Sequence, residues 1–261
     1  MKRAIEPVEP RPEDATRSRI RDFWTRNVNA EVLFGRRVSA GDRGTPEYFA
    51  DLERQRYRSH RHLIPWISGM EPGRSVLEIG CGVGMDSHRM ARHGLDVTGV
   101  DLTEIAVQTA HRRFEAEGIE GSFLSADALR LPFADASFDY VYSFGVLHHA
   151  QDTAGTIREL HRLLKPGGEA RIMLYHRRSL NELVHRFLRV PFEEKHELCP
   201  VVRRFTKAEV RAMFSDFSAT HLHLDFVFGE GYGLIFRLTP DWIYRALSRH
   251  FGWHLMIRAT R

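Results

Sequence analysis

The stretch SVLEIGCGVG, residues 75–84, decides the fold. Its first five residues are mostly apolar, as in a strand buried on both faces of a sheet. Gly80, Gly82 and Gly84 then favour a turn, and a helical stretch follows from Met85 to His93 before Gly94 ends it. A strand, a glycine turn and a helix in this order predict one βα unit of a parallel sheet.

The same alternation continues toward the C-terminus. Helices are expected at 103–118, 153–164, 181–190 and 240–250, and Thr206-Lys207-Ala208-Glu209 is a capping box that starts another. Strands are expected at 75–79, 95–100, 121–125, 138–144, 170–175, 221–228 and 253–259, the last two as a closing pair. Apolar strands separated by helices predict an α/β protein with a doubly wound, mostly parallel seven-stranded sheet.

The N-terminal region has a different character. Residues 1–16 mix prolines with charges, which predicts a flexible arm. Helices are expected at 17–35 and at 45–62, the second with Thr45 as its cap and Pro46 at its first position. Residues 17–74 are therefore interpreted as a helical preamble that covers the sheet as a lid.

The glycine turn has the features of a nucleoside-binding site. Backbone can approach a ligand closely at glycine, and Asp101 ends the next strand 21 residues after Gly80, where a carboxylate can bind ribose hydroxyls. The alternative is a plain glycine turn. NAD would require a third glycine at position 85, which is Met85. S-adenosylmethionine (SAM) is a cation, and residues 76–176 carry 14 acidic and 9 basic side chains, which favours SAM.

Four ordered segments extend this pattern: VLEIGCGVG at 76–84, VTGVD at 97–101, SADALRLPFADASFDYVYSFGVLHH at 125–149 and LLKPGGEARIML at 163–174. Together they resemble class I SAM-dependent methyltransferases, in particular the small-molecule group that includes the ubiquinone and menaquinone C-methyltransferases. The resemblance covers roughly residues 55–220. It implies a Rossmann-like methyltransferase fold, a SAM-binding domain over 75–261 and a lid insertion near 176–200.

The resemblance also implies which residues bind SAM. Asp101 would bind the ribose, and Asp127 would accept a hydrogen bond from the adenine amino group. The complete expected set is Glu78, Gly80, Cys81, Gly82, Asp101, Leu102, Asp127, Ala128, Ser143 and Gly145. Cys81 is a small residue in a tight turn and is not interpreted as a nucleophile.

Methyl transfer to oxygen or nitrogen can need a base, whereas a carboxylate acceptor needs none. His148 follows the fourth strand, and Tyr175 and His176 end the fifth, so these three are the candidate catalytic groups, with His148 ranked first. The alternative for His148 is that it only shapes the cleft.

Trp24, Tyr57 and Arg177 are the candidate substrate contacts, because they belong to the preamble and the insertion. The alternative for the two aromatic residues is an ordinary amphipathic helix packed on the core. No metal site is expected, because the chain has only two cysteines and the His221–His223 pair has no third ligand at a recognisable spacing.

Composition limits the remaining function classes. The net charge of +4 is dispersed, so no nucleic-acid partner is expected. The N-terminus lacks an apolar signal region, and no apolar run approaches the ~20 residues of a transmembrane helix, so a cytoplasmic location is expected. The oligomeric state stays open. A SAM-fold protein without catalysis, regulating or scaffolding a partner, is the alternative function.

The flanking regions carry net charges of +4 (residues 1–75) and +5 (residues 177–261) around the acidic centre. This polarity suggests a hypothesis in which the acceptor is a small anion attracted by arginines. The arginines concerned are Arg54, Arg56, Arg58, Arg61, Arg177, Arg178, Arg186 and Arg189. The alternative is a solvated surface of a chain that uses arginine as its usual cation.

Overall fold

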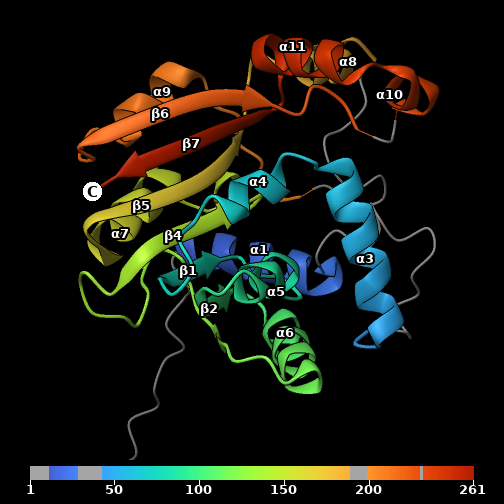
Figure 1. Ribbon diagram of the computed structural model, residues 1–261. Coiled ribbons are helices and arrows are strands. Elements are labelled where there is room, and N and C mark those ends of the chain that lie inside the picture. The colour runs from blue at the N-terminus through green and yellow to red at the C-terminus, as the bar shows by residue number, and fades with distance from the viewer. Residues whose placement is uncertain (1–11, 29–42, 189–198, 230–231) are drawn as a thin grey trace, which may run out of the picture.

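The computed structural model of the protein describes residues 12–28, 43–188, 199–229 and 232–261 (Figure 1). These residues contain a seven-stranded sheet with the order β3-β2-β1-β4-β5-β7-β6. Its strands are β1 (Ser75–Ile79), β2 (Asp96–Asp101), β3 (Ser122–Ser125), β4 (Phe138–Phe144), β5 (Leu164–Tyr175), β6 (Ala219–Asp225) and β7 (His254–Thr260).

Most of the sheet is parallel. Strands β1 to β5 pair in parallel, whereas β7 runs antiparallel to both of its neighbours, β5 and β6. The order reverses at β1, whose neighbours are β2 on one side and β4 on the other. This confirms the doubly wound, mostly parallel sheet predicted from the sequence, and it places the first glycine loop at the crevice where α/β proteins bind ligands.

Helices accompany these strands as the alternation predicts. They are α1 (Pro12–Arg26), α3 (Pro46–Ser59), α4 (Leu63–Ser68), α5 (Met85–Arg92), α6 (Glu104–Glu117), α7 (Thr153–Leu163), α8 (Leu180–Leu188), α9 (Lys207–Met213), α10 (Leu234–Leu238) and α11 (Asp241–Phe251). The 3-10 turn η3 (Leu147–His149) follows β4. In the described part of the chain, no helix is long and apolar enough to cross a membrane.

Alternate residues of the central strands face two separate cores. Leu77 and Ile79 of β1 belong to a cluster with side chains of α7 and α9, whereas Val76 belongs to a second cluster with side chains of α4 and α5. Because successive side chains of a strand point to opposite faces, a strand covered by helices on both faces must be apolar throughout. This is why the run at 75–79 is mostly apolar rather than alternating.

The N-terminal helices differ from their predicted bounds. Helix α1 begins at Pro12, not at Arg17, so residues 12–16 belong to a helix rather than to the predicted arm. A proline suits this first position because the N–H it lacks has no intrahelical partner there. The helix ends at Arg26, and the predicted end at Gly35 lies outside the described residues.

Helix α4 and the start of strand β5 also differ from the sequence prediction. Helix α4 was not predicted, yet Pro65 fits because it is the third residue of this helix, still within the first turn. Strand β5 begins at Leu164 rather than at Ala170. Residues 165–168, which lie between the predicted helix and the predicted strand, bulge out of β5 between the pairs Phe138–Leu164 and Tyr140–Glu169. Gly168 is required there, because a Cβ would lie 2.9 Å from the Asp139 carbonyl oxygen.

The two side-chain caps predicted from the sequence, at Thr45 and Thr206, are present. Thr206 accepts a hydrogen bond from the Glu209 N–H, and the Glu209 carboxylate accepts one from the Thr206 N–H, as the capping box predicts. Thr103 is the N-cap residue of α6, but its hydroxyl donates to Asp101 Oδ1 instead of capping the helix. Helix α10 was not predicted from the sequence.

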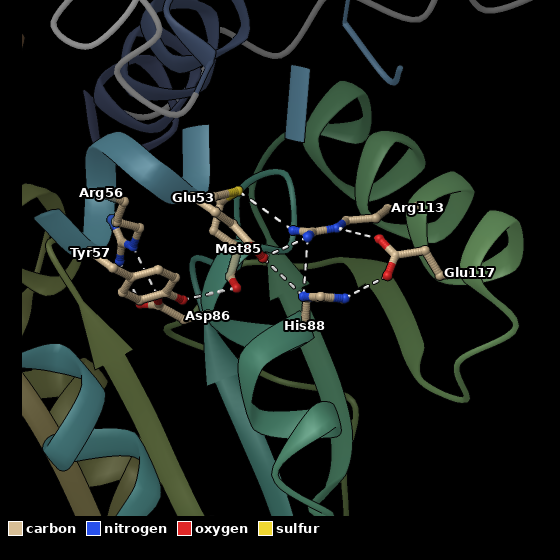
Figure 2. A network of polar contacts seen from close by, with 8 residues as sticks. All are labelled: Glu53, Arg56, Tyr57, Met85, Asp86, His88, Arg113 and Glu117. Carbon is tan, nitrogen blue, oxygen red and sulfur yellow. Dashed lines mark hydrogen bonds and ion pairs between the residues drawn. The ribbon is translucent and has the colours of Figure 1, made fainter. Parts of the chain in front are cut away.

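A polar network attaches α3 to the sheet domain (Figure 2). Glu53 accepts from Arg113 Nη2 at 2.6 Å, and its Oε1 lies 2.9 Å from His88 Nδ1, so this carboxylate joins α3 to α5 and α6. Arg56 donates from Nε to Asp86 Oδ1 at 2.8 Å and makes a second bond through Nη2. These contacts fix the orientation of α3. Arg56 also lines the cavity described below.

Candidate functional site

A cavity of about 510 Å³ lies at the carboxyl ends of β1, β2, β4 and β5, and residues of α1, α3 and α8 also line it. Its volume is within the range of small-molecule sites, roughly 300–1,000 Å³. The position agrees with the rule that open α/β sheets bind ligands outside the carboxyl ends of strands where the strand order reverses.

The glycine loop forms one wall of this cavity for two physical reasons. Gly80 has a φ of +73°, and a Cβ at this position would lie 2.2 Å from Val146 Cγ2, so any side chain here would collide with the segment after β4. Gly82 donates its backbone N–H to Asp101 Oδ2 at 3.0 Å. The loop therefore packs against two strand ends and exposes backbone, not side chains, to the cavity.

Two carboxylates, one buried and one half-buried, belong to the cavity wall. Glu78 and Asp101 line it, and the described residues contain no ion-pair partner for either. Burial raises the pKa of Glu78 well above its usual range, with Asp86 adding to the rise and a hydrogen bond from Ser87 opposing it. Burial also raises the pKa of Asp101, while hydrogen bonds from Thr103 and Gly82 oppose that rise. A bound cation would stabilise the ionised form of both groups.

Two other cavity acids are neutralised within the chain. Asp86 is ion-paired with Arg56, and it also accepts hydrogen bonds from Tyr57 and Tyr142. Burial alone would raise the pKa of Asp86, but these contacts lower it below the usual range. Asp127 accepts from Arg17 Nη1 at 3.2 Å. The two acids at the glycine-loop end that have no ion-pair partner among the described residues are therefore Glu78 and Asp101.

Nine of the ten residues expected to bind SAM line this cavity. They are Glu78, Gly80, Cys81, Gly82, Asp101, Leu102, Asp127, Ala128 and Gly145. Ser143 does not; it is buried, and its hydroxyl donates to the Ile79 carbonyl at 2.9 Å, which joins the ends of β4 and β1. Burial raises the pKa of the Cys81 thiol, which favours its neutral form over the nucleophilic thiolate.

The candidate catalytic residues separate into two groups. Tyr175 lines the cavity, whereas His148 and His176 do not. The His148 ring is fully buried against Tyr175, with 3.7 Å between ring centroids, and both of its nitrogens lack hydrogen-bond partners. Burial lowers the pKa of both histidines. His148 follows its strand as predicted, but the η3 turn directs it into the core behind Tyr175.

The three candidate substrate residues lie in three different environments. Trp24 lines the cavity and contacts His149 edge to face, with 5.0 Å between centroids. Tyr57 does not line it, because its hydroxyl lies 2.9 Å from Asp86 Oδ1 inside the polar network. Arg177 is on the surface, where it contacts Glu209 and the Arg204 carbonyl.

Residues that sequence reasoning did not select form the opposite end of the cavity. Phe226, His254 and His60 make an aromatic stack, with centroids 4.4 Å apart for Phe226–His254 and 4.8 Å for His60–Phe226. Phe144 contacts His254 edge to face. His60 follows α3, and Phe226 and His254 lie at neighbouring ends of β6 and β7, so no local sequence pattern could bring them together.

One histidine pair joins this end to the surface. His254 Nδ1 lies 3.0 Å from Nε2 of His62, and His62 lines a second, smaller cavity together with Asp225. Burial lowers the pKa of His254 well below its usual range, and burial lowers the pKa of His62 to about 4 although Asp225 opposes this. Both rings are therefore neutral near pH 7. Among the described residues, no group of three potential ligands has a geometry that could hold a metal ion.

Comparison with known proteins agrees with this geometry. Residues 77–172 match the model of a methyltransferase domain family. A sterol 24-C-methyltransferase of Gibberella zeae is 38% identical over 112 residues, which are 42% of this chain and 30% of the relative. The 2-methyl-6-phytyl-1,4-hydroquinone methyltransferase of Synechocystis is 31% identical over 150 residues, 56% of this chain and 47% of the relative. The chain thus spans less than half the length of the curated relatives that it matches.

Solved structures extend the similarity to nearly the whole chain. Magnesium protoporphyrin IX methyltransferase from Synechocystis, solved with bound SAH, has a TM-score of 0.59 at 20% identity and covers 94% of this chain and 99% of its own. A SAM-dependent methyltransferase from Thermotoga maritima has a TM-score of 0.60 at 18% identity and covers 82% of this chain and 97% of its own. The chain therefore has the fold of class I SAM-dependent methyltransferases, and its residues 77–172 match a methyltransferase domain family.

Proposed function

We propose that this protein transfers a methyl group from SAM to a small-molecule acceptor. The observation that carries the proposal is a pair of carboxylates, buried Glu78 and half-buried Asp101, which line a cavity beside the glycine loop and have no ion-pair partner among the described residues. SAM carries a sulfonium and an ammonium, so a donor of this charge suits the acidic end of the cavity. The relatives act, by their names, on sterols and a hydroquinone, which supports a small acceptor.

The residues divide into a donor end and an acceptor end. At the donor end, Asp101 at the tip of β2 would bind the ribose hydroxyls and Asp127 after β3 would bind the adenine, a proposal supported by the position of both in the cavity wall. When bound, SAM supplies an electrophilic methyl group whose transfer is an in-line displacement. The protein contributes mainly by orienting the two reactants, since positioning alone can supply several kcal/mol of the barrier reduction.

The acceptor end favours a flat or apolar molecule over a small anion. Its walls are the rings of Phe144, Phe226, His60 and His254, and the imidazoles there are kept neutral by burial. Of the arginines in the anion hypothesis that the structure describes, only Arg56 lines the cavity, and Asp86 neutralises it. Arg189 lies outside the described residues. The geometry thus favours an aromatic or hydrophobic acceptor.

For an oxygen or nitrogen acceptor, we assign the role of base to His254, which lines the cavity at its acceptor end. If His62 Nδ1 carries a proton toward Asp225, at 4.0 Å, then His62 Nε2 accepts from the Nδ1–H of His254. This tautomer leaves Nε2 of His254 free to accept the acceptor's proton. The base need not be strong, because the attacking atom becomes acidic as its bond to carbon forms. Tyr175, which lines the same cavity, is assigned to positioning the acceptor.

Calorimetric titration of the purified chain with SAM and with S-adenosylhomocysteine tests the donor assignment, with NADH as the control ligand. Incubation with SAM and a metabolite extract then tests transfer, by mass spectrometric search for products heavier by one methylene unit. We expect SAM to bind, NADH not to bind, and a methylated product to form. SAM binding without any product would favour the alternative of a regulatory SAM-fold protein. A cytoplasmic location and the absence of a nucleic-acid partner stay predictions.

A further inference from the structure

Large apolar side chains are concentrated on the outer surface of three helices. Eight such side chains are exposed in the described part of the chain, and seven of them lie on α8, α10 and α11. With their exposed fractions they are Leu183 (63%), Phe187 (84%), Leu234 (68%), Ile235 (61%), Leu238 (74%), Trp242 (74%) and Phe251 (50%). The eighth is Ile64 on α4. A concentration of this kind marks a binding surface, whereas isolated apolar residues do not.

The three helices form one structural unit. They pack on a small core of Val227, Phe228 and Phe236, to which α8 contributes Leu180 and α11 contributes Tyr244 and Leu247. Figure 1 shows α8, α10 and α11 together at one end of the molecule, beyond the edge of the sheet formed by β6 and β7. Each helix therefore uses one face for this core and leaves another apolar face exposed, which we call the apolar cap.

Basic side chains are interspersed on the same helices. Arg186 of α8, Arg237 of α10 and Arg245 and Arg249 of α11 are all exposed. The acids of these helices are Glu182 and Asp241: Glu182 lies 3.3 Å from Arg204 Nε, and Asp241 lies 3.1 Å from Arg61 Nη1 and 3.7 Å from Arg245 Nη2, so two acids stand against four arginines. The apolar cap thus combines aromatic and aliphatic side chains with an excess of positive charge.

The combination of apolar side chains and arginines distinguishes between two partners for the apolar cap, a second copy of the chain and a lipid bilayer. In a symmetric dimer through the apolar cap, the same arginines of two copies would approach each other, and like charges across an interface are unfavourable. An anionic bilayer instead neutralises arginines at the headgroups and receives the apolar side chains below them, with Trp242 suited to the interface between the two. Each arginine near such a surface adds to the electrostatic attraction.

We propose that the apolar cap binds peripherally to the surface of an anionic lipid bilayer. The proposal does not depend on methyl transfer. It has a consequence that rests on the proposed function: α8 also contributes Asn181 and His185 to the wall of the cavity, so a bilayer-bound cap places the acceptor end of the cavity close to the lipid. The acceptor would then be a lipid-soluble or amphipathic molecule, in agreement with the aromatic walls of the acceptor end.

Sedimentation with lipid vesicles tests the proposal. The full chain should sediment with vesicles that contain phosphatidylglycerol in phosphatidylcholine, should sediment at least about tenfold less with phosphatidylcholine alone, and should be partly released by salt. Emission of Trp242 should shift to the blue on binding, and Trp242→Phe should remove that change. If the wild-type chain does not sediment with the anionic vesicles, the proposal is overturned.

Variants separate the apolar and charged contributions. Phe187→Ser with Leu238→Ser should reduce vesicle binding at least about tenfold, whereas Ile64→Ser, an exposed apolar residue outside the cap, should not. Arg245→Glu with Arg249→Glu should remove the preference for anionic lipid, whereas Arg112→Glu, an exposed arginine on α6, should not.

Two control measurements complete the experiment. All variants should keep the wild-type melting temperature and SAM affinity, so that loss of the fold is distinguished from loss of the surface. Sedimentation equilibrium without lipid should show a monomer, and a dimer abolished by the Phe187→Ser, Leu238→Ser variant would overturn the proposal in favour of a subunit interface. A chain that binds vesicles but not SAM would contradict the proposed function alone, and the reverse result would contradict only the bilayer proposal.

Discussion

Asp101 Oδ2 accepts the backbone N–H of Gly82 at 3.0 Å, and Asp101 Oδ1 accepts the backbone N–H of Thr103 at 2.9 Å and its hydroxyl at 2.8 Å. One carboxylate thereby fixes the position of the glycine loop after β1 relative to the start of α6. The same group lines the cavity. The acid at the end of β2 consequently has two roles that substitution will affect together, the order of the loop and the charge of the donor site.

Asp101→Ala should weaken SAM binding by about 1–3 kcal/mol, because the substitution removes a charged acceptor from buried donors. Calorimetry of the folded variant measures the effect. Asp96→Ala is the matched control, since Asp96 is an exposed acid at the other end of the same strand. Unchanged SAM affinity in a folded Asp101→Ala protein would remove Asp101 from the donor site.

Arg56→Met should destabilise the protein by about 3–5 kcal/mol, because it leaves the buried Asp86 carboxylate without its cation. The double variant Arg56→Met, Asp86→Asn should be less destabilised than Arg56→Met alone, since no unpaired charge is buried. Urea unfolding measures both. Arg54→Met, which breaks the exposed pair with Asp51, should change the stability by less than about 1 kcal/mol. A double variant no more stable than the single one would contradict this account.

Stability should fall in acid through Glu53. Burial would raise the pKa of Glu53, but hydrogen bonds from His88 and Arg113 lower it to about 2, below its ordinary value of 4.5. A carboxylate with a lowered folded-state pKa stabilises the fold above its unfolded pKa, and that contribution is lost as the pH falls from 4.5 toward 2. After allowing for solvent screening, the contribution is roughly 1–2 kcal/mol.

The Glu53→Gln variant isolates this contribution. Its deficit in unfolding free energy relative to wild type should be largest near neutral pH and should shrink as the pH is lowered through this window, as urea unfolding at several pH values will show. Asp216→Asn, a change at an exposed acid for which the described residues provide no ion-pair partner, is the control. A deficit that does not change with pH would mean that Glu53 contributes by packing rather than by charge.

Deletion of residues 1–44 should leave a cooperatively folding protein, because the strands begin at Ser75 and α3 keeps its cap, Thr45. It should weaken SAM binding at least about tenfold, or about 1.4 kcal/mol, because Ile20, Trp24 and Val28 line the cavity. Thermal unfolding and calorimetry test the two parts separately. Full SAM affinity would show that α1 covers the cavity without contributing to binding.

His254→Phe should keep the ring stack on Phe226 but lower methyl transfer to an oxygen or nitrogen acceptor by about 10²–10⁴-fold. SAM affinity should stay within about twofold, because His254 lies at the acceptor end. His148→Phe is the control, since His148 does not line the cavity and should affect turnover much less. Equal losses in the two variants would indicate that both histidines act only by packing.

The sequence by itself determined the elements whose information is local. Mostly apolar runs at 75–79 and 138–144 predict strands buried on both faces, and the capping box at Thr206 predicts the start of α9, because strand burial and helix capping depend on neighbours within a few residues. The glycines at 80 and 82 with Asp101 similarly predict one end of the cavity. All three lie at strand ends, and parallel strands in a doubly wound sheet bring their carboxyl ends to the same edge.

Only the tertiary structure decided which histidines line the cavity. His148 follows its strand as predicted, but η3 turns it behind Tyr175, while His60, Phe226 and His254 meet at the cavity from three distant segments. Contacts between such segments depend on strand order and helix orientation, which no local pattern encodes. For the same reason Tyr57 is a structural residue: its hydroxyl contacts a carboxylate 29 positions away that the fold brings beside it. The partners of a buried polar group are chosen by the packing of the whole chain, because each buried donor and acceptor must find a partner wherever the fold has placed one.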